Sequence, residues 1–439
     1  MRRVATFGFV LAVLLASVAA GCGGSSSSSS GSADITFWTG FSERELGVMK
    51  DVVADFEKSH PNIHVKVVGG ISDDKIVAAI RGGNAPDVAH SFDAGAYTGA
   101  YCSNGAWIDL ADYMKRDALS DDVFPAVPRQ YSQYNGTRCA LPMLADVYGL
   151  YYNKDLFAKA GLSGPPKTAS ELMDYAKRLT ERNPDGSLKV VGLDPLDGFY
   201  ENVAAHWAPS WGVDWTDESG KSILSTSPGW AAMLRWQKEL VDWYGYDNLV
   251  RFQASAGDEF SAQQAFERGK LAMNLDGEWR VAFIQAEHPE LKFGTAPFPV
   301  DDSQPDLYGS GYTSGSIIGI PKTSKHQDEA WELLKYLATD TGALVKMTNG
   351  IRNVPTTSEA LSSPDIKPDP EFNIFLDIFA NPNTRTTPIT LVGSANQDLV
   401  DSFVTKYQAG KVDDLEAGLA NLDKQIDAQL EAAGGSQVP

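Results

Sequence analysis

The sequence predicts an α/β protein built from two lobes, and three observations support this. Strand patterns and helix patterns alternate along the chain, which is typical of lobes with mainly parallel sheets. The alternation begins near residue 35 and begins again near residue 148. In addition, the roughly 400 residues after the N-terminal segment exceed what one hydrophobic core usually serves.

The N-terminal segment has the composition of a signal peptide. Two arginines precede an apolar run over residues 10–20, which is too short to span a bilayer, and small residues then lead to Cys22. We expect residues 1–21 to be removed. The ending Ala-Ala-Gly-Cys resembles a bacterial lipobox, in which the cysteine is acylated. Because Ala19 stands where leucine is usual, cleavage without lipidation is the alternative.

Residues 23–33 contain only glycine, serine and alanine. Such a segment cannot bury a core and behaves as flexible coil. We therefore expect residues 22–33 to form a lipidated cysteine followed by a tether. This arrangement predicts an extracytoplasmic protein that is anchored to the cell membrane as a lipoprotein.

The net charge excludes some classes of partner. Removal of residues 1–21 takes away two arginines and no acid, so the formal charge changes from −20 to −22. This excess of acid argues against nucleic acid and anionic lipid headgroups as partners. It does not restrict a neutral ligand.

Two cysteines remain after Cys22, and they are Cys102 and Cys139. In an exported chain their expected pairing is a disulfide. It would close a loop of about 38 residues and contribute about 4 kcal/mol on the chain-entropy estimate. Two buried free thiols are the alternative.

The first lobe is expected to begin with a strand over 35–38. Ser42 and Glu45 form a capping box that opens a helix, and apolar residues at three- and four-residue spacing continue the helix to Pro61. A strand, a helix and a strand follow, at 63–67, at 73–81 and from Val88.

The second lobe is expected to begin with a strand over 148–153. Thr168 and Glu171 form another capping box, and the tryptophan-rich segment 194–243 is predicted to be mostly helical. Later elements are predicted as strands over 271–275 and 316–320, a helix around 331–337 and an amphipathic helix over 415–430.

Aromatic and polar side chains follow the predicted strands of the first lobe. Ligands of open α/β sheets lie beyond the carboxyl ends of the strands, which selects Trp38, Ser91 and Asp93. An indole beside hydroxyl and carboxylate groups suits a sugar, because the ring covers the apolar face of a pyranose while the polar groups bind its hydroxyls. Core packing of Trp38 and a turn or helix cap at Asp93 are the alternatives.

Three tryptophans, Trp207, Trp211 and Trp215, recur every fourth residue. This spacing places them on one helical face, although Pro209 and Gly212 interrupt such a helix and make a loop-rich wall the alternative. A lone tryptophan is more often in the core. Three so close together favour a ligand platform, and we expect it to be Trp207 or Trp211.

Several segments carry a resemblance to a known family. The run GLYYNKDLF at 149–157 and KAGL at 159–162 resembles the crossover segment of the family 1 extracellular solute-binding proteins, the group that includes maltose-binding protein. Further matches follow the same order along the chain, at 37–38, 83–88, 273–279 and 315–337.

This resemblance implies a two-lobed periplasmic-binding-protein-like fold of type II, with a ligand cleft between the lobes. The chain would cross between lobes near Asp146, Gly311 and Asn353. The lobes would comprise 34–146 plus 311–352 for the N-terminal lobe, and 147–310 plus 353–439 for the C-terminal lobe.

The resemblance also implies site residues. Trp279 matches the position that stacks on the sugar in this family. Residues at the crossings line the cleft, which adds Asp146, Tyr148, Tyr312 and Arg352 as candidates.

The predicted function is therefore that of a monomeric solute-binding lipoprotein of an ABC importer, which delivers a sugar or oligosaccharide to a membrane permease. We expect no catalysis, cofactor or metal site. A binder of a glycerophosphodiester or sugar phosphate with the same fold is one alternative, because Arg352 offers a positive charge. A secreted carbohydrate-active enzyme is the other, and it would need two carboxylates facing one bond.

Overall fold

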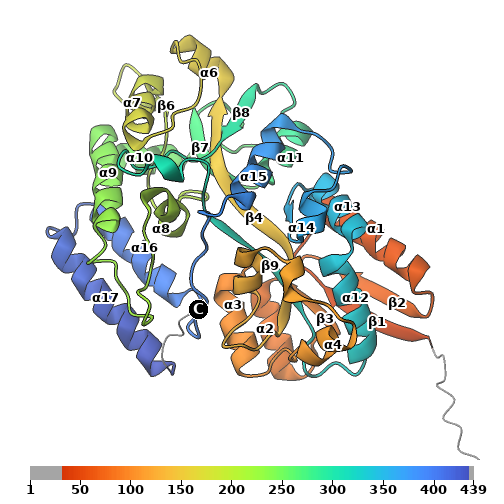
Figure 1. The fold of residues 1–439 in the computed structure, drawn as a ribbon. Coiled ribbons are helices and arrows are strands. Elements are labelled where there is room, and N and C mark those ends of the chain that lie inside the picture. Colours follow the sequence, from red (N-terminus) through yellow and green to blue (C-terminus); the bar gives the residue numbers. More distant parts are fainter. Residues whose placement is uncertain (1–31, 435–439) are drawn as a thin grey trace, which may run out of the picture.

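The computed structural model describes residues 32–434 (Figure 1). The predicted signal peptide, Cys22 and most of the predicted tether lie outside the described residues. Ala33, which was predicted to end the tether, already begins strand β1 (Ala33–Trp38). Its backbone pairs in parallel register with Ile63 of β2 (Ile63–Val68), so the folded body starts there.

The sheet of the first lobe is mixed. Strands β2, β1 and β3 (Val88–Ser91) are parallel, as the strand and helix alternation predicts. Beyond β3 the sheet continues with antiparallel strands, in the order β3, β9 (Thr313–Gly319), β4 (Ala140–Asn153) and β10 (Val354–Pro355). The sheet therefore combines strands from the start of the chain with strands far along it.

One strand, β4, belongs to both lobes. Residues 140–147 pair with β9, and residues 148–153 pair with β7 (Met273–Gly277) and β8 (Phe293–Ala296). Only the second half was predicted from the sequence. Because β4 is buried along nearly its whole length, its first half lacks the polar alternation that identifies a strand.

Helices of the first lobe cover this sheet on both faces (Figure 1). The disulfide between Cys102 and Cys139 joins one of them to the start of β4. They are α1 (Glu43–Ser59), α2 (Asp73–Gly82), α3 (Ala94–Ser103), α4 (Ala111–Arg116), α5 (Ala126–Tyr131), α12 (Gln327–Thr339), α13 (Thr341–Ile351) and α14 (Ser358–Leu361), with a 3₁₀ turn η1 (Asp121–Val123).

The second lobe is largely helical around β7, β8 and the end of β4. Its other elements are α6 (Lys154–Lys159), α7 (Ala169–Leu179), β5 (Glu181–Arg182), β6 (Leu188–Val190), α8 (Ala204–Trp207), η2 (Ala208–Trp211), α9 (Pro228–Tyr244), α10 (Tyr246–Gln253), α11 (Arg280–Glu287), η3 (Pro305–Leu307), α15 (Pro370–Ala380), α16 (Ala395–Gln408) and α17 (Leu415–Ala432).

Two local predictions are wrong. The segment 194–243 is not mostly helical, because helical turns occupy only 204–211 and the part from Pro228 onwards. Ser42 precedes α1, but its side chain caps no backbone N–H there. At the second predicted capping box, Thr168 Oγ1 accepts from the Glu171 N–H at 3.3 Å, while the Glu171 carboxylate accepts from the Lys167 N–H at 2.7 Å.

The third crossing lies later than predicted. Strand β10 pairs with Leu144 and Ala145 in the first-lobe sheet, and α14 packs against α13. Residues 354–361 therefore lie with the first lobe, although the sequence assigned them to the second. The reason is that the chain adds strand β10 to the edge of the first-lobe sheet before it crosses into the second lobe.

Within residues 32–434, no helix is both long enough and apolar enough to cross a membrane.

Candidate functional site

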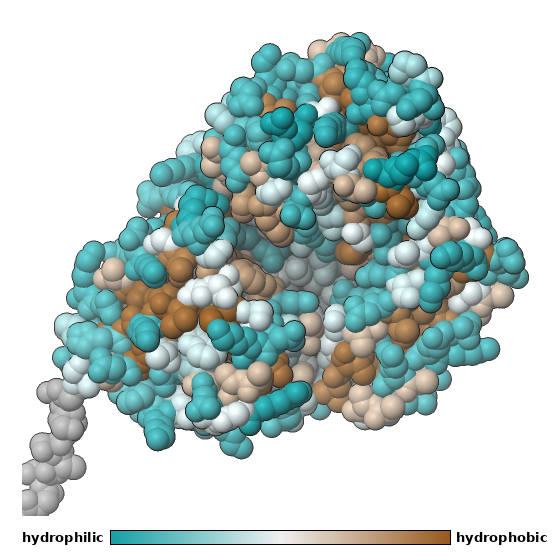
Figure 2. All heavy atoms as spheres, turned by 180° about the vertical axis from the view of Figure 1, so that it is seen from behind, coloured by the Kyte–Doolittle hydropathy of each residue, from teal (hydrophilic) through white to brown (hydrophobic). Residues whose placement is uncertain are grey.

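A cavity of about 820 Å³ lies between the two lobes. Viewed from behind, the molecular surface is hollowed between its upper and lower masses (Figure 2). Asp146 and Asn353, at two of the predicted crossings, belong to the lining. The other lining residues are Gly40, Phe41, Ser42, Glu43, Arg44, Glu45 and Phe92 from the first lobe and Glu201, Phe260, Trp279, Phe283, Ala286 and Glu287 from the second.

Trp279 lies in the turn between β7 and α11 and lines this cavity. Its ring covers Gly277, where an added Cβ would come within 2.2 Å of ring carbons, so the turn needs a glycine there. The ring also meets Tyr148 edge-on, with centroids 5.6 Å apart. The Trp279 indole nitrogen is buried and has no hydrogen-bond partner among the described residues. The partly exposed ring thus offers an apolar face to a ligand.

The same turn is fastened to the crossings through Glu278. This fully buried carboxylate accepts from the Val147 N–H at 2.6 Å and from Asn353 Nδ2 at 2.8 Å. Asn353 Nδ2 also donates to Asp146 Oδ1 at 2.7 Å. One amide group therefore links a second-lobe turn to the strand that joins the lobes.

The acids at the base of the cavity have raised pKa values. Burial, with Glu45 and Asp93 nearby, raises the pKa of Asp146 to about 7. Burial, with Asp146 nearby, raises the pKa of Glu278 well above its usual range. Both carboxyl groups are therefore readily protonated in the ligand-free protein.

Glu201 enters the cavity from the loop before α8. Burial raises its pKa well above the usual range, and the neighbouring acid Glu259 raises it further. The ring of His206 contacts the Glu201 carbonyl oxygen at 2.7 Å and packs on Tyr148. Burial lowers the pKa of His206 to about 4, so this imidazole is neutral at pH 7 and supplies no positive charge.

The lining is rich in acids and aromatic rings. The cationic side chain that the described residues contribute is Arg44, which lies 3.8 Å from Glu45 and 5.7 Å from the Phe283 ring centroid. The acids in the lining are Glu43, Glu45, Asp146, Glu201 and Glu287. Such a cavity suits a ligand that donates hydrogen bonds, and it disfavours an anion.

Of the residues predicted to bind ligand, Asp146 and Trp279 line the cavity. Tyr148 and Tyr312 lie buried beneath it, with ring centroids 5.5 Å apart. The Tyr312 hydroxyl also lies 3.3 Å from Thr387 Oγ1. These two tyrosines support the wall.

Trp38 and Ser91 are the last residues of β1 and β3, and Asp93 follows β3, but all three lie outside the cavity lining. Trp38 packs partly buried against a small apolar cluster, and Ser91 is fully buried. Asp93 caps α3 by accepting from the Ala96 N–H at 2.8 Å. Asp93 thus serves as a helix cap in this structure, while its neighbour Phe92 faces the cavity.

Trp207 and Trp211, one of which is predicted to be a ligand platform, are both buried in this structure. Trp207 is 1% exposed, and its indole N–H donates to Asn202 Oδ1 at 2.9 Å. Trp211 is also buried and packs near Trp236. Both belong to the core of the second lobe, because the short turn over 204–211 directs these rings inward.

Arg352 also lies outside the cavity lining. It ends α13 with φ of 71°, and its guanidinium pairs with Asp369 at 3.1 Å and stacks on Phe372. The positive charge of Arg352 is therefore engaged by Asp369 outside the cavity lining.

Sequence reasoning missed several lining residues, among them Phe260, Phe283 and Glu201. Phe260 lies in a loop, which gives no periodic signal. Phe283 lies one helical turn after Trp279, and this spacing from a predicted site residue could have identified it. Glu201 has no local signal. Within the described residues, no group of three or more His, Cys, Asp and Glu side chains is placed to hold a metal ion.

The chain is similar in sequence to known binding proteins. The family model described as bacterial extracellular solute-binding protein matches residues 42–344, well over half of the chain. The maltotriose-binding protein of Pyrococcus abyssi is 22% identical over 348 residues, covering 77% of this chain and 70% of that protein. The mannitol-binding protein of Pseudomonas aeruginosa is 28% identical over 320 residues, covering 70% and 69%.

Solved structures agree with the observed fold. CpMnBP1 with mannobiose bound superposes with a TM-score of 0.78 at 26% identity, covering 90% of this chain and 99% of that one. Maltose-bound MalE3 of T. maritima gives 0.74 at 23% identity, covering 91% and 100%. The type II two-lobed arrangement is thus shared, as predicted.

Proposed function

The chain belongs to the bacterial extracellular solute-binding proteins, a family of binding proteins, and from this premise we propose that it captures a sugar or oligosaccharide for an ABC importer. The observation that carries the proposal is the partly exposed face of Trp279 in an acid-lined cavity between two lobes. An indole face suits the apolar side of a pyranose, and carboxylates accept hydrogen bonds from its hydroxyls. Relatives named for maltotriose and mannitol support this ligand class.

Binding uses both lobes. The sugar ring lies on Trp279, and Asp146, Glu201 and Glu45 accept from its hydroxyl groups. Strands β4 and β9 hold the lobes together, and closure is favoured because only the closed form adds the contacts of Phe41 and Phe92 from the other lobe. The closed monomer then docks on a permease, which is energised by a separate ATPase.

Attachment to the membrane through Cys22 belongs to the same proposal. The lipobox-like ending and the glycine and serine tether support it. Cys22→Ser should release the protein from the membrane fraction or leave it unprocessed. Maturation and membrane retention equal to wild type would contradict the anchor.

The proposal includes no chemical step on the sugar. Glycoside hydrolysis requires an acid and a second carboxylate placed on opposite sides of one bond. Incubation of the purified protein with the bound oligosaccharide should produce no new reducing ends. A time-dependent rise in reducing ends that Glu201→Gln abolishes would identify an enzyme instead.

A thermal-shift screen tests the ligand class. Mono- and oligosaccharides are compared with matched sugar phosphates and with glycerophosphodiesters. A ligand at 100 times its Kd should stabilise the folded state by about 2.7 kcal/mol. We expect neutral sugars to raise the Tm and their phosphates to have little effect, because acids line the cavity. A larger shift with the phosphates would contradict the proposal.

A further inference from the structure

We propose that Arg280 is a positioning residue for the second-lobe side chains that line the cavity. The inference rests on the proposed function and specifies how this wall is held. Arg280 lines no part of the cavity and is 1% exposed. Two lining residues, Phe260 and Phe283, contact its guanidinium directly. Two others, Trp279 and Glu201, are linked to it through the acids Asp276 and Glu259.

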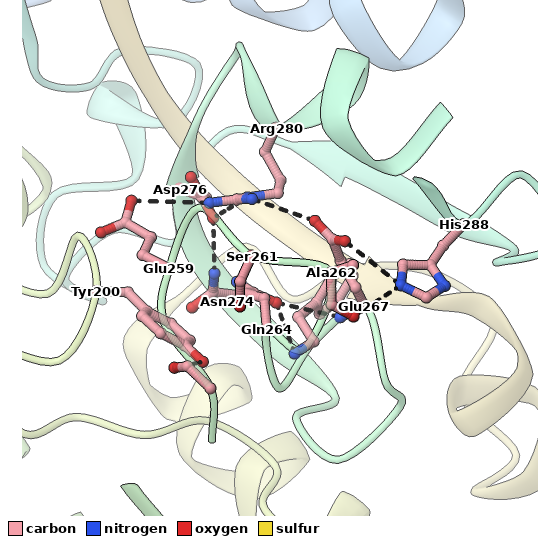
Figure 3. Close-up of polar contacts among 12 residues, drawn as sticks. Tyr200, Glu259, Ser261, Ala262, Gln264, Glu267, Asn274, Asp276, Arg280 and His288 are labelled. Carbon is pink, nitrogen blue, oxygen red and sulfur yellow. Dashed lines mark hydrogen bonds and ion pairs between the residues drawn. The ribbon is translucent and has the colours of Figure 1, made fainter. Parts of the chain in front are cut away.

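The guanidinium lies among three carboxylates (Figure 3). Arg280 Nε donates to Asp276 Oδ2 at 2.9 Å, Nη1 donates to Glu267 Oε1 at 3.2 Å, and Nη2 lies 3.7 Å from Glu259 Oε1. A buried cation is costly to desolvate unless acids surround it in good geometry. The planar guanidinium meets this need because its N–H groups point in several fixed directions.

Two aromatic rings of the cavity rest on the same guanidinium. Its central carbon lies 5.6 Å from the Phe260 ring centroid and 5.3 Å from that of Phe283. Phe260 is 58% exposed, so it has little other packing to fix its ring. Cation–π contact with Arg280 is therefore a main constraint on the orientation of Phe260.

The turn that carries Trp279 is closed by the same group. Asp276 accepts from Arg280 Nε, from the Gly277 N–H at 2.9 Å and from Asn274 Nδ2 at 3.0 Å. These bonds bracket Trp279 between the end of β7 and the first residue of α11. Loss of the Arg280 bond would free the turn and let the indole change its angle to the cavity.

Arg280 is linked to Glu201 through Glu259. Glu201 and Glu259 are neighbouring acids, and burial together with Glu259 raises the pKa of Glu201 well above its usual range. The charge of Arg280 favours the ionised form of Glu259, and Glu201 then keeps the proton. Glu201 can thus offer an O–H donor to a sugar oxygen while its other oxygen accepts.

Arg280→Lys is the informative substitution, because an ammonium keeps the charge and loses the planar fork. Arg138→Lys is the matched control. Arg138 is also a buried arginine, 4% exposed, and it pairs with Asp121 at 2.9 Å in the first lobe, outside the cavity lining. Calorimetric titration with the sugar that gives the largest thermal shift, and a melting curve, are recorded for both variants.

We expect Arg280→Lys to weaken sugar binding by about 10- to 100-fold. This is the loss of affinity typical when a residue that orients the ligands of a metal is mutated, and Arg280 orients the sugar-binding side chains in a comparable way. Arg138→Lys should lower the Tm by a similar amount and change the affinity by less than about twofold. Equal affinities in the two folded variants would overturn the proposal. If Arg280→Lys does not fold, Glu259→Gln carries the test, and wild-type affinity in that variant would overturn it.

A ligand-free measurement separates this inference from the proposed function. In protein labelled with 5-fluorotryptophan, the Trp279 resonance is assigned by its loss in Trp279→Phe. It should shift or broaden in Arg280→Lys and stay unchanged in Arg138→Lys. An unchanged Trp279 signal in Arg280→Lys would overturn the positioning role, whereas a wild-type protein that binds no sugar would overturn the proposed function alone.

Discussion

Two tryptophan-bearing regions of the second lobe look similar in the sequence and differ in the structure. Trp207 and Trp211 lie on short helical turns and point into the core, where Trp207 finds a hydrogen-bond partner. Trp279 follows the end of β7 and stays partly exposed at the cavity, with its N–H unpaired among the described residues. The difference teaches that the number of tryptophans close together in the sequence does not reveal whether their rings reach the cavity.

Trp207→Ala should have the largest effect, and the effect should be on stability. Removal of this fully buried ring leaves a cavity and takes away the donor to Asn202 Oδ1, so we expect the free energy of unfolding to fall by about 3 to 5 kcal/mol. Chemical denaturation measures this loss. Protein that remains folded should bind sugar as wild type does, and a selective loss of affinity would break the distinction between the two regions.

Trp279→Ala should have the opposite profile. Truncation of an aromatic anchor in a binding site costs about 2 to 4 kcal/mol, which corresponds to roughly 30- to 1000-fold in Kd. The melting temperature should fall less than in Trp207→Ala, because Trp279 is only partly buried. Calorimetry beside a melting curve checks both values. Unchanged affinity in a folded variant would remove Trp279 from the site.

Two buried acids extend the comparison to pH. The pKa of Asp146, beneath Trp279, is raised to about 7 by burial with Glu45 and Asp93 nearby, and the pKa of Asp194, near Trp207, is raised to about 7 by burial. The folded carboxyls hold their protons up to about pH 7, whereas the unfolded ones release them near pH 4. Stability of the ligand-free protein should therefore fall as pH rises from about 4 to 7.

Asp146→Asn and Asp194→Asn separate the two regions. Each variant should show a smaller fall in Tm over this pH window, because each removes one titrating group. Only Asp146→Asn should also weaken sugar binding. Melting curves at several pH values, with titrations at pH 7, provide the measurement. A binding defect in Asp194→Asn would contradict the assignment of Asp194 to the core.

Arg352→Gln should have little effect on binding. Because Arg352 pairs with Asp369 outside the cavity, its loss should leave sugar affinity within about twofold. Stability should fall by about 1 to 3 kcal/mol, since Asp369 loses a charged partner. Titration and denaturation of the same preparation test this. A large loss of affinity would return Arg352 to the site.

Much of the fold could be predicted from the sequence, since periodic apolar patterns and turn residues mark β1, α1, β2 and α17 directly. The first half of β4 could not, because a strand buried on both faces shows no alternation. The late third crossing depends on pairing between Val354 and Ala145, residues far apart in sequence.

The candidate site divides in the same way. Asp146 and Trp279, which line the cavity, could be predicted because the family resemblance points to them. Phe260 and Glu201 come from loops whose path is set by tertiary contacts such as those of Arg280. The burial of Trp207 could not be predicted, because its spacing shows a shared face and does not reveal whether that face points inward.

A crystal structure of the protein with the sugar that gives the largest thermal shift tests the central claim most directly. We predict that the sugar occupies the cavity between the lobes, with one ring in van der Waals contact with the Trp279 indole and its hydroxyls donating to Asp146 and Glu201. A sugar bound away from this cavity, with the Trp279 face left uncovered, would contradict the account.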